Sequence, residues 1–99
     1  MRMMLKSQLN VDAANMAIAD GSIGPVLDKV MGLCKPEAAY FLTEGGLRTV
    51  YIIFDMATPE QVSQIAEPLF HAFGASVEFR PVMIAPELQK GIIAWAAAR

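Results

Sequence analysis

The sequence is poor in the residues that build disulfides and metal centres. It contains one cysteine, Cys34, and one histidine, His71. One cysteine cannot form an intramolecular disulfide, and two isolated ligands do not make a zinc-binding cluster. We therefore expect neither a metal nor a cofactor.

Charged residues and long apolar runs are also scarce. Charged residues make up 18% of the chain, and the formal net charge is −2, so a basic surface for nucleic acid is not expected. The longest apolar run, 92–98, is far shorter than the ~20 residues that cross a bilayer. The apolar stretch 3–5 is too short for a signal peptide. These features exclude nucleic acid and membrane as partners and indicate a cytoplasmic protein.

Apolar residues, in contrast, are abundant. They make up 55% of the 99 residues, which excludes disorder and indicates one folded domain spanning 1–99. A chain of this length buries only about two thirds of the surface that its unfolded form exposes. Some apolar surface is therefore expected to need a partner, and a homodimer is the simplest one.

The first third of the chain predicts a strand followed by a broken pair of helices. Residues 1–9 alternate in part between apolar and polar side chains, as a half-buried strand does. Asn10 is a suitable cap for a helix that begins at Val11. A second helix is expected to begin at Pro25 and to end before Pro36.

Residues 38–56 predict a β-hairpin. Two apolar, aromatic-rich runs flank Gly45-Gly46, and two glycines accept the positive φ angles of a tight primed turn. This turn fixes the cross-strand pairs, which are Glu44 with Leu47, Leu42 with Thr49, and Tyr40 with Tyr51. One face then carries Tyr40, Leu42, Tyr51 and Ile53, and the other carries Ala39, Phe41, Val50, Ile52 and Phe54. Since both faces are apolar, one is expected to form an interface or a ligand-binding wall.

The remaining residues predict a helix, a strand and a terminal helix. Thr58-Pro59 followed by Gln61 is a capping box and predicts a helix start. The apolar stripe of this helix ends at Gly74, and a kink is expected at Pro68. A strand is expected over 76–84, where Pro81 indicates an edge position. A short helix over about 86–98 presents one apolar side, formed by Leu88, Ile92, Trp95 and Ala96. This helix is expected to cap the domain or to contact a neighbouring chain.

The order strand, helix, hairpin, helix, strand is that of the ferredoxin-like α+β fold, a four-stranded antiparallel sheet with helices on one face. With its second apolar sheet face, the chain resembles the dimeric α+β barrel superfamily. The segments 65–70 (IAEPLF) and 75–83 (ASVEFRPVM) are similar to a branch of small bacterial proteins in it to which no chemistry is assigned.

The resemblance implies a range of activities. Members of the superfamily include cofactor-free oxygenases of aromatic polyketides, haem-degrading oxygenases, muconolactone isomerases and non-catalytic ligand-sensing modules, and the fold does not choose among them. Haem-degrading members pair a helix histidine with a tryptophan and an asparagine. The helix expected to carry His71 has no tryptophan near it in sequence, so the chain departs from that pattern.

Tyr40, Tyr51 and Arg48 are the candidate ligand-binding residues. The two tyrosines are expected to be neighbours on one face and to orient an aromatic or keto compound, although packing is the more frequent role of such a pair. Arg48, near the turn, has the charge to attract an anion, although a solvated arginine is the more common outcome. Cys34 is expected to be a buried apolar residue.

No catalytic residue can be assigned, and the candidates for proton transfer are Tyr51, His71 and Asp55. The helical spacing favours an exposed His71 paired with Glu67. Asp55, like Glu44, would need burial to raise its pKa towards neutrality. The leading hypothesis is a homodimer that binds a small hydrophobic or aromatic molecule in a barrel or sheet-helix cavity. The alternatives are a cofactor-independent monooxygenase or isomerase acting on an aromatic substrate, and a non-catalytic assembly module.

Overall fold

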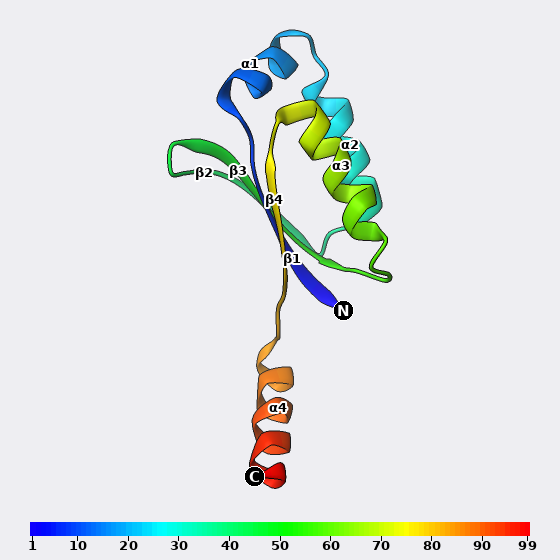
Figure 1. Ribbon diagram of the computed structural model, residues 1–99, viewed down its shortest axis with the longest axis vertical. Coiled ribbons are helices and arrows are strands. Elements are labelled where there is room, and N and C mark those ends of the chain that lie inside the picture. The colour runs from blue at the N-terminus through cyan, green and yellow to red at the C-terminus, as the bar shows by residue number, and fades with distance from the viewer.

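The computed structural model describes all residues from 1 to 99 and has the ferredoxin-like α+β fold (Figure 1). The elements are, in chain order, β1 (Arg2–Gln8), α1 (Val11–Ala19), α2 (Ile23–Cys34), β2 (Ala38–Glu44), β3 (Leu47–Asp55), α3 (Gln61–Phe73), β4 (Ser76–Pro81) and α4 (Ala85–Ala98). The four strands form one antiparallel sheet in the order β2-β3-β1-β4. The predicted fold class is therefore confirmed.

The hairpin of β2 and β3 has the predicted turn and register. Gly45 and Gly46 have φ angles of 61° and 78°, which lie in the left-handed region that glycine adopts without steric cost. Tyr40 pairs with Tyr51, and Leu42 pairs with Thr49. The hairpin therefore divides its side chains between the two faces of the sheet as the sequence predicts.

The core lies between one face of the sheet and helices α1, α2 and α3 (Figure 1). β1 contributes Leu5 and β3 contributes Ile52 and Phe54, all of them fully buried. The ring of Phe54 meets Phe79 of β4 edge to face, with ring centroids 6.3 Å apart. No helix covers the opposite side of the sheet, which we call the open face. Its side chains on β1–β3 are Arg2, Met4, Lys6, Gln8, Ala38, Tyr40, Leu42, Glu44, Leu47, Thr49, Tyr51, Ile53 and Asp55, and β4 adds Ser76, Glu78 and Arg80.

Several element boundaries differ from the predicted ones. The cap of α1 is confirmed, since the Asn10 side chain accepts a hydrogen bond from the Ala13 amide at 3.0 Å. α2 begins at Ile23 and takes Pro25 into its first turn, where the missing amide hydrogen has no intrahelical partner to lose. The predicted start at Pro25 was therefore two residues too late.

The start of α3 is also shifted. Pro59 and Glu60 form a turn, and the helix begins at Gln61, whose side-chain oxygen accepts hydrogen bonds from the amides of Ala57 (2.6 Å) and Thr58 (3.3 Å). The predicted reach of Gln61 back to the chain is confirmed, but Thr58 is not the helix cap. The helix continues through Pro68 as far as Phe73.

β4 ends at Pro81, three residues earlier than predicted, and α4 leaves the domain there. α4 extends away from the sheet and gives the molecule a longest dimension of 56 Å against 28 and 19 Å across (Figure 1). None of its residues is buried. Of the two expectations for this helix, the one that it caps its own domain was therefore wrong, and the one that it contacts a neighbouring chain stays a prediction. No helix has the length and apolar character needed to cross a bilayer.

Candidate functional site

A cleft of about 370 Å³ lies between α2 and the hairpin. It lies where α2 contacts β3 and α3 contacts β4, while the middle of the edge strand β2 stays exposed. Phe41 of β2 is on the helix side of the sheet, yet 63% of it is exposed. The volume lies within the range of roughly 300–1,000 Å³ that small-molecule sites occupy.

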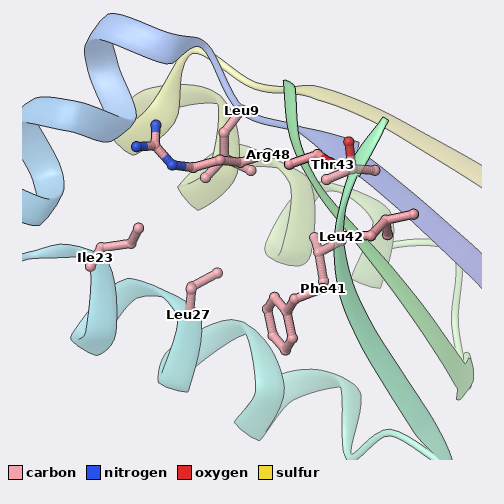
Figure 2. Close-up of a pocket in the computed structure, with 9 residues that line it drawn as sticks. Leu9, Ile23, Leu27, Phe41, Leu42, Thr43 and Arg48 are labelled. Atoms are coloured by element: carbon pink, nitrogen blue, oxygen red, sulfur yellow. The ribbon is translucent and has the colours of Figure 1, made fainter. Parts of the chain in front are cut away.

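The walls of the cleft are apolar. Ile23 and Leu27 project from the first half of α2, and the ring of Phe41 faces them from β2 (Figure 2). Leu9 and Val50 are further apolar residues of the lining, and Leu42 of β2 also lines the cleft although its side chain is on the open face of the sheet. A flat aromatic or aliphatic molecule that entered the cleft would remove these surfaces from water.

Arg48 is the only charged residue that lines the cleft. It extends from β3 across one end of the cleft towards α1, where one of its terminal nitrogens donates to Asn15 Oδ1 at 2.9 Å (Figure 2). No carboxylate lies within 4 Å of its guanidinium. Thr43, its cross-strand neighbour in the hairpin, also lines the cleft. The site therefore combines apolar walls with one positive charge that has no anionic partner.

A polar cluster lies on the open face. The Tyr51 hydroxyl donates to Glu44 Oε1 at 2.6 Å, and the Lys6 ammonium forms an ion pair with the second carboxylate oxygen. The hydrogen bond from Lys6, followed by that from Tyr51, lowers the pKa of Glu44. The same contact with Glu44 raises the pKa of Tyr51 and that of Lys6. Because all three pKa values move away from neutrality, the cluster holds its charges and is unsuited to proton transfer near pH 7.

The open face is consequently less apolar than the hairpin alone predicts. The cluster of Lys6, Glu44 and Tyr51 lies within it, and β1 contributes the lysine. The prediction of two apolar faces considered the hairpin strands but not the central strand between β3 and β4. It holds for the edge of the face, at Tyr40 and Leu42, and fails at its centre.

The structure separates the predicted ligand-binding residues. Arg48 lines the cleft, whereas Tyr40 and Tyr51 lie on the other side of the sheet. The two tyrosines are neighbours, as predicted, but the Tyr51 hydroxyl is already engaged by Glu44, and 63% of Tyr40 is exposed. Neither tyrosine can reach a molecule held in the cleft.

The candidates for proton transfer do not share a site. Asp55 is exposed at the end of β3, where the Met1 ammonium at 2.7 Å lowers the pKa of its carboxylate. His71 lies on the outer side of α3 with its Nε2 3.1 Å from Glu67, the exposed pair that the helical spacing predicts. Tyr51 is on the open face. No group of three or more His, Cys, Asp or Glu residues is placed to hold a metal ion.

Four cleft residues were not singled out from the sequence: Phe41, Ile23, Leu27 and Leu9. The hairpin register placed Phe41 on the helix side, and the apolar spacing of α2 included Leu27. The position at which α2 crosses the sheet could not be predicted from the sequence.

Comparisons with known proteins support the fold and nothing more specific. No family model and no curated protein matches the chain. Among solved structures, a formyltetrahydrofolate deformylase from Pseudomonas putida KT2440 is 11% identical with a TM-score of 0.50, and the match covers 82% of this chain. It covers only 28% of the deformylase chain. A de novo designed protein, Ferredog-Diesel, is 13% identical with a TM-score of 0.49 and coverage of 82% and 85%. At this level of identity the likeness to the deformylase concerns the fold alone.

Proposed function

We propose that the protein binds a small aromatic or hydrophobic anion, such as an aromatic carboxylate, in the cleft between α2 and the hairpin. The observation that carries this proposal is the position of Arg48, the one charge in an otherwise apolar lining, with no carboxylate beside it. A guanidinium in this state gains most from a planar anion that accepts two parallel hydrogen bonds.

The proposed binding mode assigns a separate role to each part of the lining. The apolar body of the ligand lies between Phe41 and Leu27, and its anionic group replaces or joins Asn15 at the Arg48 guanidinium. Since the lining contains no histidine, cysteine, lysine or carboxylate, we propose binding as the role of the cleft. The proposal therefore retains the predicted sheet-helix cavity and Arg48, and gives no role to Tyr40 or Tyr51.

The test compares 2-naphthoate with its neutral analogue 2-naphthamide. Titrations followed by amide chemical shifts are expected to show tighter binding of the naphthoate and to place the perturbed residues at Ile23, Leu27 and Arg48. Arg48→Gln is expected to abolish the preference for the anion, whereas the matched variant Arg80→Gln, on the open face, leaves it intact. Equal affinity for the two compounds in the unmodified protein, or shifts confined to the open face, would overturn the proposal.

We also propose that the chain acts as a homodimer, as its composition and its resemblance to the dimeric α+β barrel superfamily imply. The support is the amount of apolar surface that a single chain leaves exposed, both on the open face and on α4. Sedimentation velocity across micromolar concentrations tests this proposal, and a sedimentation coefficient that stays at the monomer value would overturn it.

A further inference from the structure

α4 has an apolar side that nothing in its own chain covers. Leu88, Ile92 and Trp95 follow each other at spacings of four and three residues, which places them on one side of the helix. They are 48%, 54% and 64% exposed. The Trp95 ring is contacted by the Arg99 guanidinium of the same helix, 5.1 Å from the ring centre. An isolated helix of about 14 residues is marginally stable in water, so this stripe needs a surface to pack on.

The contacts at the base of α4 hold it away from its own domain. The Val82 amide donates to the Arg2 carbonyl at 3.1 Å, and the Arg2 guanidinium lies 3.1 Å from Glu87. Glu87 also accepts a hydrogen bond from the Ile84 amide at 3.0 Å, which begins the helix. Only residues 82–84 link β4 to α4. Folding α4 back over its own sheet would break the ion pair between Arg2 and Glu87, which favours a surface on another chain as the cover for the stripe.

The open face is the matching uncovered surface. Its exposed edge carries Tyr40 and Leu42, and Met4 and Ile53 are partly exposed beside them. α4 is about 21 Å long at 1.5 Å per residue, and a seven-residue strand such as β2 is about 23 Å long at 3.3 Å per residue. One helix of this length is therefore sufficient to cover the apolar edge of the face along a whole strand.

We propose that α4 of each chain packs its stripe of Leu88, Ile92 and Trp95 on the open face of a second copy, which returns its own α4 in the same way. A second copy fits because both complementary surfaces are present in every chain, so a two-fold axis satisfies both at once. Large aromatic side chains bury roughly 150–250 Å² each. Each partner offers two that are mostly exposed, Trp95 (64%) on the stripe and Tyr40 (63%) on the face, as the main part of the roughly 800 Å² that a standard interface buries per partner.

This inference rests on the homodimer of the proposed function and does not require a ligand in the cleft, which lies on the other side of the sheet and shares Leu42 and Thr49 with the open face. It also specifies which surfaces meet. In a dimeric α+β barrel the two open faces would contact each other directly, whereas here each open face contacts the partner's α4.

Trp95 is the only tryptophan and therefore reports the contact directly. As the protein is concentrated through its dimerisation range, we expect Trp95 emission to shift to shorter wavelength and its quenching by acrylamide to fall several-fold. Ile92→Glu is expected to raise the dimer dissociation constant by about tenfold or more, because it would bury an unpaired carboxylate. Ile93→Glu, the same change about 100° around the helix and off the stripe, is expected to leave the constant nearly unchanged.

A mixing experiment identifies the surface. A Trp95→Phe chain with Tyr40→Cys, labelled with a nitroxide, is expected to quench the Trp95 fluorescence of unlabelled chains when the two are mixed. The same label at Ser63→Cys, on the exposed side of α3, is expected to have little effect. Buried Cys34 does not compete for the label, because burial raises the pKa of its thiol to about 11.

Each alternative gives a distinct result. A dimer in which Trp95 stays fully open to acrylamide would overturn the α4 contact and leave the homodimer in place. A monomer with shielded Trp95 would show α4 folded back on its own domain, and a monomer with exposed Trp95 would overturn both the contact and the homodimer. Equal weakening by Ile92→Glu and Ile93→Glu would overturn the assignment of the stripe.

Discussion

The Tyr51 hydroxyl and the Glu44 carboxylate, 2.6 Å apart, join the middle of β3 to the end of β2 across the open face. Lys6 of β1 binds the other carboxylate oxygen, so Glu44 links all three strands. A tyrosine in the middle of an uncovered face thereby has a polar partner for its hydroxyl, and its ring lies 5.9 Å from the lysine ammonium. The face therefore has a polar cluster at its centre and exposed apolar side chains at its β2 edge.

The cluster predicts a specific acid response. The pKa of Glu44 is lowered from 4.5 in the folded state by Lys6 and Tyr51, so the unfolded chain binds a proton at a higher pH than the folded chain does. The stability from this group is therefore present above about pH 4.5 and is lost as the pH falls through the lowered value. We expect Glu44→Gln to be less stable than the unmodified protein at neutral pH and to approach it below that window.

Urea unfolding at a series of pH values measures this difference. Tyr51→Phe, which removes one of the two contacts and keeps the ion pair with Lys6, is expected to lie between Glu44→Gln and the unmodified protein at neutral pH. The pKa of Asp55 is also lowered, but Asp55 is present in the unmodified protein and in both variants. Its contribution therefore cancels when the stabilities of these proteins are subtracted. A constant stability difference from pH 3 to pH 7 would show that the cluster does not hold the Glu44 charge.

A second prediction concerns two glycines that have open space where a Cβ would be. Gly46 has a φ of 78° in the hairpin turn, whereas Gly32 lies inside α2 at an ordinary helical φ. Gly46→Ala is expected to cost about 1–2 kcal/mol through backbone strain alone. Gly32→Ala is expected to stabilise the protein by about 0.5–1 kcal/mol, because alanine loses less freedom on folding. Denaturant titrations check both, and effects of the same sign would contradict the assigned backbone conformations.

A third prediction concerns Cys34, which is buried at the end of α2. Burial raises the pKa of its thiol from 9.0 to about 11, so the fraction present as thiolate near pH 8 is about 100-fold lower than for a free cysteine. We expect a thiol reagent to modify Cys34 only as fast as the core opens. Val30→Ala, one turn earlier in the same core, should speed the reaction by lowering stability. Complete reaction of the unmodified protein within the mixing time would contradict this burial.

Features set by residues close together in the sequence were predicted better than features set by contacts between distant elements. Local geometry was predictable: Gly45-Gly46 fixed the hairpin register, and Asn10 fixed the start of α1. The helix boundaries near proline were less predictable, since Pro25 and Pro59 suit more than one position at a helix start. Packing decides which of these positions the proline takes.

The candidate site was predictable only in part, because its residues come from separate elements. Arg48 was identified from its own properties, but its partner Asn15 lies 33 residues away in sequence. Phe41 was assigned to the correct face of the sheet, but its exposure depends on how far α2 extends towards the edge strand. The polar centre of the open face was missed because Lys6 meets Glu44 through β1, which is distant from the hairpin in sequence.

The last prediction concerns the link that sets the direction of α4. The Arg2 guanidinium lies 2.9 Å from Glu37 and 3.1 Å from Glu87, so one cation ties the start of α4 to the segment before β2. Glu87→Gln removes the charge but retains an oxygen for the Ile84 amide, and it is therefore expected to loosen the direction of α4 without unwinding its first turn. In dilute, monomeric protein the fluorescence anisotropy of Trp95 should fall in this variant. The control is Lys90→Gln, which neutralises a residue of the same helix that has no ion-pair partner and should leave the anisotropy unchanged. Identical anisotropy in both variants would show that the backbone of residues 82–84, and not the ion pair, holds α4 in place.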